Sequence, residues 1–180
     1  MIDGSTVQLS DPYAWIDLGA IAKGYIGDML AEFLVGRGVT GALIDLGGDI
    51  IAVGSRQDGT PWRIGVKEPV AGSSELLGVI EVSGVSIISS GIYERKLEVD
   101  GVSYHHILDP FTGMPVRSDV VSATIVADSA VIGEGLSTIA VLLGSERVSG
   151  LFEQASGFIG AVLVLENGDV LELGDVRLMR

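Results

Sequence analysis

The stretch GEGLSTIAVLL, residues 133–143, combines a glutamate between two glycines, a Ser-Thr pair and an apolar run. It forms most of a segment, residues 129–143, whose apolar spacing predicts a helix. This helix follows directly on residues 120–127, which predict a strand. A helix that adjoins a strand in this way must bury its apolar side against a sheet.

Turn residues and periodicity divide the rest of the chain into short elements. Apolar residues at helical spacing predict a helix at residues 20–35, and Asp100-Gly101 between two alternating runs predicts a hairpin turn. The other predicted elements are strands at residues 5–9, 41–46, 49–53, 62–66, 76–82, 85–89, 96–99, 102–105, 158–166 and 170–173, and a helix at residues 146–155. We therefore expect one α+β domain over residues 1–180, with helices packed on a mainly antiparallel sheet.

Composition excludes several classes of function. Hydrophobic residues make up 47% of the 180-residue chain and charged residues 19%, which predicts a folded protein. The net charge of −13 repels nucleic-acid backbones and anionic lipids, so we expect no nucleic-acid partner. The chain has no cysteine, which excludes disulfides and thiolate sites. Its first residues show no leader pattern, and no apolar run reaches the roughly 18 residues of a membrane span.

The first candidate site is DLGAIAKG, residues 17–24, where Asp17 ends a predicted strand and Lys23 lies at the start of a predicted helix. Small residues at a helix N-terminus expose backbone N–H groups that attract phosphate, and Lys23 would contact the same ligand. The spacing does not fit a Walker A motif. The structural alternative is that Asp17 caps the helix while Lys23 is a surface residue.

The second candidate is HHILDPFTG, residues 105–113, which contains both histidines of the chain. Adjacent side chains of a strand face opposite sides, so at most one histidine easily faces a site. Asp-Pro and Thr-Gly predict a rigid turn of the kind that positions a general base. The alternative is an edge-strand histidine that is hydrogen-bonded to the backbone. Two histidines and one aspartate make a poor zinc site.

The third candidate is the pair Glu134 and Thr138, which lie four residues apart and so share one helix face. Carboxylate and hydroxyl oxygens suit a hard cation such as Mg²⁺, which takes few protein ligands. The alternative is that Glu134 compensates the helix dipole from the first turn and that Thr138 bonds back to its own helix.

Together these motifs resemble the family of FAD:protein FMN transferases, the ApbE-like proteins. The resemblance rests on five segments in the same order: DLGAIAKGY (17–25), DLGGD (45–49), SSGIYER (89–95), HHILDPFTG (105–113) and GEGLSTIAVLLG (133–144). It implies a T-fold-like α+β structure that binds FAD with Mg²⁺, splits the pyrophosphate, passes FMN to a threonine of an acceptor flavoprotein and releases AMP. A cation between an acidic protein and an anionic pyrophosphate is physically consistent with this.

The resemblance also implies roles for single residues. Asp17 and Lys23 would contact FAD, and His106 with Ile107 would lie against the flavin nucleotide. His106 or Asp109 would take the proton of the incoming hydroxyl.

The same resemblance implies a metal site. The backbone of Ala20 and the side chains of Glu134 and Thr138 would hold Mg²⁺. The family usually has aspartate, in the pattern Ala-Asp-Ala-Leu-Ser-Thr, where this chain has Glu134 between two glycines.

The chain corresponds to the C-terminal part of such a protein. Family members carry more than a hundred residues before the first motif, so we expect exposed apolar surface here and therefore a homodimer. The resemblance implies a bacterial protein, usually exported or lipid-anchored. Two further interpretations remain: an FAD pyrophosphatase that gives FMN and AMP, and a flavin-binding or scaffold domain without catalysis.

Overall fold

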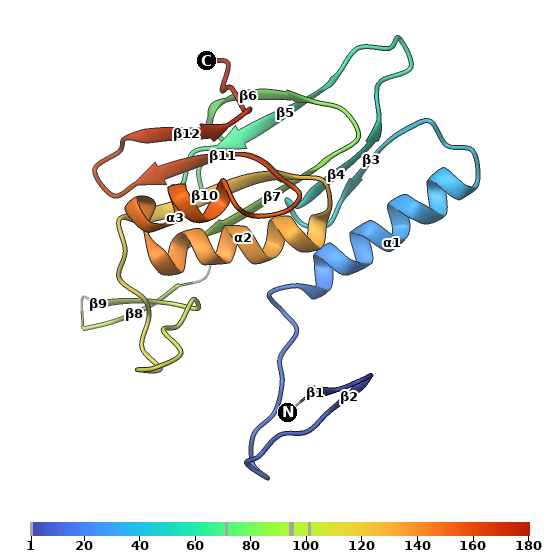
Figure 1. The fold of residues 1–180 in the computed structure, drawn as a ribbon. Helices are drawn as coiled ribbons and strands as arrows, with labels where there is room; N and C mark the ends of the chain where they lie inside the picture. Colours follow the sequence, from blue (N-terminus) through green and yellow to red (C-terminus); the bar gives the residue numbers. More distant parts are fainter. Residues whose placement is uncertain (1, 71, 94–95, 101) are drawn as a thin grey trace.

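A six-stranded antiparallel sheet is the centre of the computed structural model, which describes residues 2–70, 72–93, 96–100 and 102–180. The strand order is β12-β11-β10-β7-β4-β3 (Figure 1). These strands are β3 (Gly41–Asp45), β4 (Ile50–Gly54), β7 (Ser86–Gly91), β10 (Val120–Ala127), β11 (Phe158–Leu165) and β12 (Val170–Gly174). The structure thereby confirms the predicted α+β class and the predicted strands of this sheet to within two residues at each end.

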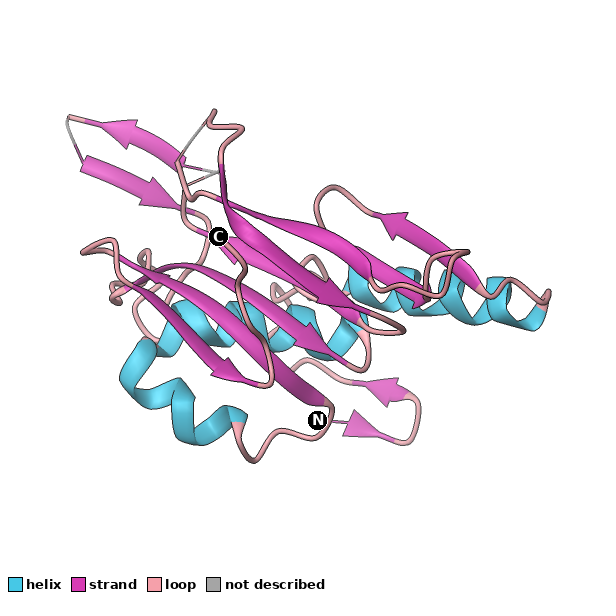
Figure 2. Cartoon of the chain, turned by 90° about the horizontal axis from the view of Figure 1, so that it is seen from above, coloured by secondary structure: helices cyan, strands magenta, loops and turns pink. Residues whose placement is uncertain are grey.

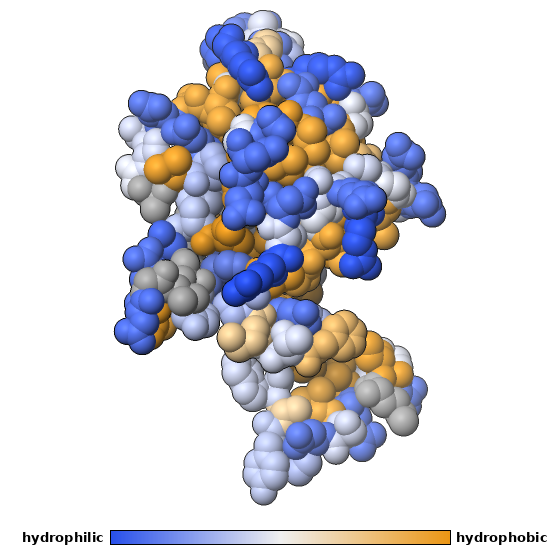
Figure 3. Space-filling model, turned by 90° about the vertical axis from the view of Figure 1, so that its left-hand side faces the viewer, coloured by the Kyte–Doolittle hydropathy of each residue, from blue (hydrophilic) through white to orange (hydrophobic). Residues whose placement is uncertain are grey.

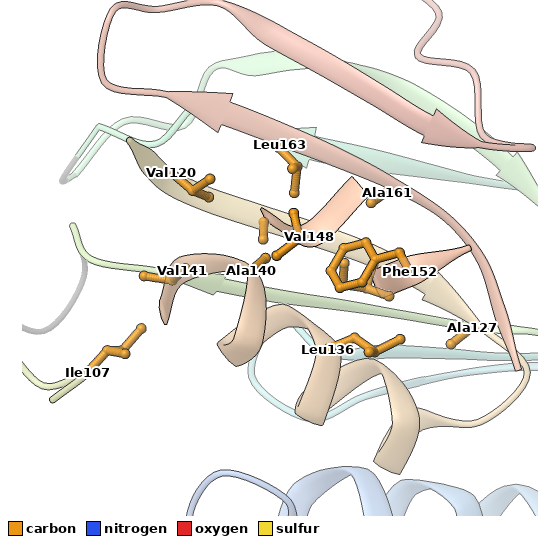
Figure 4. Close-up of a cluster of buried hydrophobic side chains, with 12 residues drawn as sticks. Ile107, Val120, Ala127, Leu136, Ala140, Val141, Val148, Phe152, Ala161 and Leu163 are labelled. Atoms are coloured by element: carbon orange, nitrogen blue, oxygen red, sulfur yellow. The ribbon is translucent and has the colours of Figure 1, made fainter. Parts of the chain in front are cut away.

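Two layers cover the sheet, because its central strands are apolar on both sides. Helices α2 (Ala130–Leu143) and α3 (Ser145–Phe152) pack on one face, against sheet residues such as Val120 and Leu163 (Figure 4). The hairpin of β5 (Trp62–Lys67) and β6 (Leu76–Val82) packs on the other face against Val126 and its neighbours. The sequence of β10 is therefore a nearly continuous apolar run, which is typical of a strand that is buried on both faces.

Helix α1 (Ala22–Gly36) docks through glycines and not through its apolar stripe. A Cβ at Gly24 would lie 2.6 Å from the carbonyl oxygen of Ala130, and a Cβ at Gly27 would lie 2.6 Å from Cδ1 of Ile51. These two glycines are the only buried residues of α1. The helix thus lies close to the start of α2 and to β4.

The apolar stripe of α1 faces solvent. Its residues Tyr25, Ile26, Met29, Leu30 and Phe33 are 40–60% exposed. Large apolar side chains are also exposed in the segment before the helix, from Ile2 to Ile21. Figure 3 shows part of this surface at the foot of the molecule. The segment includes the hairpin of β1 (Ile2–Asp3) and β2 (Thr6–Val7), which pairs with no other strand among the described residues.

The N-terminal predictions are partly wrong. The strand expected at residues 5–9 is only two residues long, and its partner at residues 2–3 was not predicted. Asp17 does not end a strand, because residues 15–18 have no regular structure. Both departures come from the lack of packing, since an isolated short hairpin has little to stabilise it.

The hairpin of β8 (Lys96–Val99) and β9 (Val102–His105) projects from the sheet (Figures 1 and 2). Asp100 has a φ of 50°, as the predicted turn requires, while Gly101 lies outside the described residues. Glu94 and Arg95, the end of the SSGIYER segment, lie outside them too. The last predicted helix, at residues 146–155, is shorter and ends at Phe152.

Substitution of Gly24 tests the close contact between α1 and α2. Gly24→Ala should lower the free energy of unfolding by about 1–3 kcal/mol, because the added methyl meets a backbone carbonyl that cannot rotate away. Gly36→Ala is the matched control in the same helix, where nothing lies within 4 Å of the added Cβ. It should be neutral or stabilise by up to about 1 kcal/mol. Urea unfolding measures both, and equal effects would contradict the described docking.

Candidate functional site

The site begins where α1 meets the first turn of α2. The carboxylate of Asp28 accepts hydrogen bonds from the backbone N–H groups of Ala130 (2.7 Å) and Val131 (3.0 Å). The Ser129 side chain caps the same helix end by accepting from the N–H of Ile132 (3.4 Å). Asp28 therefore satisfies two of the N–H groups that a helix start leaves unpaired, and it adds a negative charge where the helix dipole favours one.

This docking brings Lys23 to a pair of buried carboxylates. The ammonium of Lys23 hydrogen-bonds to Asp49 Oδ2, and its Nζ lies 3.6 Å from Glu134 Oε1. Asp49 is 2% exposed and Glu134 is 4% exposed, whereas the side chain of Lys23 is half-exposed. A cation at the surface thus faces two acids that water scarcely reaches.

Glu134 is the unusual member of this group. Neither of its carboxylate oxygens has a hydrogen-bond partner at normal geometry among the described residues. Burial raises the pKa of Glu134; the charge of Lys23 opposes that shift, and the neighbouring Asp49 adds to it. A buried carboxylate without donors is costly, so its presence indicates a site for a cation or for a proton.

Lys23 is held in its charged form. Partial burial lowers the pKa of its ammonium, but the hydrogen bond and the charge of Asp49, together with the charge of Glu134, outweigh this effect, so the pKa is raised. The ammonium therefore remains a permanent positive charge beside the two acids at neutral pH.

The structure does not place Glu134 in the first turn of α2, from which it was expected, in the structural alternative, to compensate the helix dipole. Helix α2 begins at Ala130 after the N-cap Ser129, so Glu134 is the fifth helical residue and lies in the second turn. No acidic residue occupies the first turn. The hydroxyl that bonds back to the helix is that of Ser137, which donates to the carbonyl of Glu134 (3.1 Å). Thr138 is half-buried, one turn along the helix from Glu134.

Asp17 and Ala20 lie in the exposed segment that leads into α1. Asp17 Oδ1 accepts a hydrogen bond from the N–H of Gly19 (2.6 Å) and so shapes a turn. It does not cap the helix, because the N-cap of α1 is Ile21, which has no capping side chain. The structural alternative, in which Asp17 caps the helix, is therefore wrong. No side chain caps the backbone N–H groups at the start of α1.

The histidine segment lies beside the other end of α2. Ile107 is buried in the same core cluster as Val141, and the hydroxyl of Ser118 donates to the Val141 carbonyl (2.6 Å). Glu134 and Val141 are seven residues apart, about 10 Å along the helix axis. Thr138 lies between them, so one helix face runs from Lys23 at one end to the histidine segment at the other.

The two histidines lie in different environments: His105 ends β9, and His106 follows the strand. His105 Nε2 donates to the carbonyl of Val116 (3.0 Å), whereas His106 is exposed. Asp109 Oδ1 accepts from the N–H groups of Phe111 (2.7 Å) and Thr112 (3.3 Å), which closes the loop of the Asp-Pro-Phe-Thr-Gly segment. His105 thus anchors this segment and His106 is the histidine that a ligand can reach.

Sequence reasoning missed Asp49 and Asp28. Asp49 ends the DLGGD segment and directly precedes an apolar strand. This position was the only sequence signal that its carboxylate is buried. Asp28 gave no signal, because its partners are 102 and 103 residues away in the chain.

The oxygen donors on α2 and in the segment before α1 are of the chemical kind that suits a hard cation with few protein ligands. The described residues contain no group of three or more His, Cys, Asp or Glu side chains that would hold a metal ion by themselves. Glu134 offers a buried carboxylate, Thr138 a hydroxyl and Ala20 a backbone carbonyl, which are the oxygen donors that Mg²⁺ accepts. A ligand that brings its own oxygens would complete such a site.

Comparison with known proteins gives a consistent family match. The model of the ApbE family matches residues 2–163. A curated FAD:protein FMN transferase of Klebsiella pneumoniae is 37% identical over 173 residues, which cover 96% of this chain and 52% of that protein. One from Vibrio cholerae is 34% identical and covers 93% of this chain and 50% of its own length.

Solved structures agree with the sequence matches. The flavin transferase ApbE from Vibrio cholerae superposes with a TM-score of 0.83 at 31% identity, over 97% of this chain and 56% of that one. The ApbE protein of Thermotoga maritima gives 0.78 at 35% identity, over 88% of this chain and 51% of that one. The chain thus spans about half the length of the relatives it matches. In the part of the chain that the structure describes, no helix is both long and apolar enough to cross a membrane.

Proposed function

The chain belongs to the ApbE family, and we propose that it binds FAD and takes part in the transfer of FMN to a threonine of an acceptor flavoprotein, with release of AMP. The buried carboxylate of Glu134, which has no hydrogen-bond partner among the described residues and lies 3.6 Å from the Lys23 ammonium, is the observation that carries this proposal. Curated relatives named FAD:protein FMN transferase support the reaction class. The resemblance implies that this chemistry takes place at the bacterial cell envelope.

We propose that Mg²⁺ binds to Glu134, Thr138 and the backbone of Ala20. The cation would neutralise the pyrophosphate of FAD in a protein whose net charge of −13 otherwise repels it. Glutamate is one methylene longer than the aspartate usual in the family, and its burial in the second turn of α2 supports a ligand role at this length.

The residues around the metal position would bind and orient the nucleotide. Lys23, which stays charged and half-exposed, contacts a phosphate, and Asp17 contacts FAD from the segment before α1. Buried Ile107 anchors His106 at the far end of the α2 face, and Ile107 and His106 would lie against the flavin nucleotide there. Positioning and charge stabilisation are the main requirements of such a transfer.

Exposed His106 is the proposed base. It accepts the proton of the threonine hydroxyl while the threonine oxygen bonds to the phosphorus of the FMN half and the bond to the AMP oxygen breaks. Asp109 is committed through one oxygen to two backbone N–H groups, so its role is to hold the loop that carries His106.

A reaction assay separates the transferase from the alternatives. The chain is incubated with FAD and Mg²⁺, with and without an acceptor peptide that contains threonine, and AMP, FMN and labelled peptide are measured by mass spectrometry. AMP together with FMN-labelled peptide is the expected result. AMP with free FMN would indicate a pyrophosphatase, and binding without AMP a flavin-binding or scaffold domain; either result would contradict the transferase.

Glu134→Gln tests the metal site. The amide cannot supply the charge that a divalent cation needs, so Mg²⁺-dependent binding of FAD should weaken by at least about tenfold in a fluorescence titration. Glu32→Gln, on the exposed side of α1, is the matched control and should behave as the unmodified chain. If both variants bind FAD equally well in Mg²⁺, Glu134 holds no metal.

A homodimer through α1 is the proposed oligomeric state. The apolar stripe of α1 is exposed over several turns, which is typical of an interaction surface, and a second copy would cover it. Light scattering should therefore give the mass of a dimer. The double variant Met29→Gln, Phe33→Gln should give a monomer, whereas Leu97→Gln on the projecting hairpin should not change the mass. A monomeric unmodified chain would contradict this proposal.

A further inference from the structure

We propose that Asp49 is a positioning residue, which holds the Lys23 ammonium and so keeps the Glu134 carboxylate available to a divalent cation. This inference rests on the metal site proposed for Glu134. It concerns a residue with no direct part in that site, since Asp49 acts through Lys23.

The first observation is that the lysine is bonded to one of its two acids only. Lys23 Nζ makes a hydrogen bond to Asp49, but at 3.6 Å it lies outside hydrogen-bond length from Glu134. Both carboxylates are buried to a similar degree, so burial alone does not explain the choice.

The second observation is that Asp49 is fixed where it stands. Its Oδ1 accepts a hydrogen bond from the N–H of Ser89 on β7 (3.4 Å), and its backbone carbonyl accepts from the N–H of Leu46 (2.9 Å). The carboxylate is thus tied to β7 through Oδ1 and offers Oδ2 to Lys23, while the backbone of Asp49 is held by Leu46. Glu134 has no comparable partner on either oxygen.

The third observation is the uneven charge balance of the group. One ammonium stands beside two buried acids: it hydrogen-bonds to Asp49, and it pairs with Glu134 only at 3.6 Å. Buried charges are normally paired or bound to a metal. A cation at Glu134 would complete the balance, and an ammonium at that position would compete with it.

The Lys23 ammonium and a divalent cation therefore compete for the Glu134 carboxylate, and Asp49 determines which of them binds there. The Lys23 side chain is long and half-exposed, so a shift of less than about 1 Å would bring its ammonium into contact with Glu134. Without the carboxylate of Asp49, Glu134 becomes the only acid in reach among these three side chains. The divalent cation must then displace the lysine before it can bind.

A double-mutant cycle separates this role from a simple charge effect. Mn²⁺, a hard divalent cation with a spectroscopic signal, is titrated into the chain without FAD, and free Mn²⁺ is measured by electron paramagnetic resonance. The variants are D49N, K23Q, the double variant D49N/K23Q, and E134Q. K67Q, an exposed lysine on β5, is the matched control.

We expect D49N to weaken Mn²⁺ binding and K23Q to restore it in that background. Removal of the lysine should increase the affinity for Mn²⁺ roughly tenfold more in D49N than in the unmodified chain. The reason is that only in D49N does the ammonium bind directly to the Glu134 carboxylate. D49S, which lacks the amide donors of asparagine, repeats the cycle if D49N does not fold. K67Q should leave the affinity unchanged.

Two outcomes would overturn the inference, and they are distinguishable. If K23Q increases the affinity by the same factor in both backgrounds, Asp49 acts through its charge or its structural bonds, and only this inference fails. If the unmodified chain binds no Mn²⁺, or binds it as well as E134Q does, the metal site of the proposed function fails as well.

Discussion

The contact between the Asp28 carboxylate and the first N–H groups of α2 is the interaction on which the site depends. It joins residues of two helices that lie 102 and 103 positions apart in the chain. The missing side chain of Gly24 lets their backbones approach, and Asp28 then satisfies N–H groups that would otherwise stay unpaired. Lys23 precedes Gly24 directly, so the same contact delivers the lysine to Asp49 and Glu134.

The chemistry of the site follows from that placement. α2 turns one face, from Glu134 past Thr138 to Val141, toward α1 at one end and toward the histidine segment at the other. Acids and a lysine gather at the first end, and an exposed histidine lies at the second. This arrangement suits a ligand that has an anionic middle and a reactive phosphorus. For this reason we propose FAD as the ligand.

Local patterns were sufficient to predict most of the sheet. Residues 120–127 form the strand that their apolar run indicates, and the alternating runs at 96–99 and 102–105 pair with each other as predicted. The apolar spacing of residues 20–35 correctly predicted a helix but not its packing, because the glycines, and not the apolar stripe, contact the rest of the protein. The spacing of Glu134 and Thr138 identified the right helix face. It could not reveal that Glu134 is buried beside Lys23. The contacts that bring them together, Lys23 with Asp49 and Asp28 with Ala130, join residues 26 and 102 positions apart and leave no local pattern.

The position of a bound cation and of the Lys23 ammonium tests the central claim most directly. Crystals of the chain soaked in Mn²⁺ would show the metal in an anomalous difference map and the lysine in the electron density. We predict an anomalous peak at bonding distance from the Glu134 carboxylate, with Lys23 hydrogen-bonded to Asp49. A peak remote from Glu134, or a lysine bonded to Glu134 while Asp49 stands free, would contradict it.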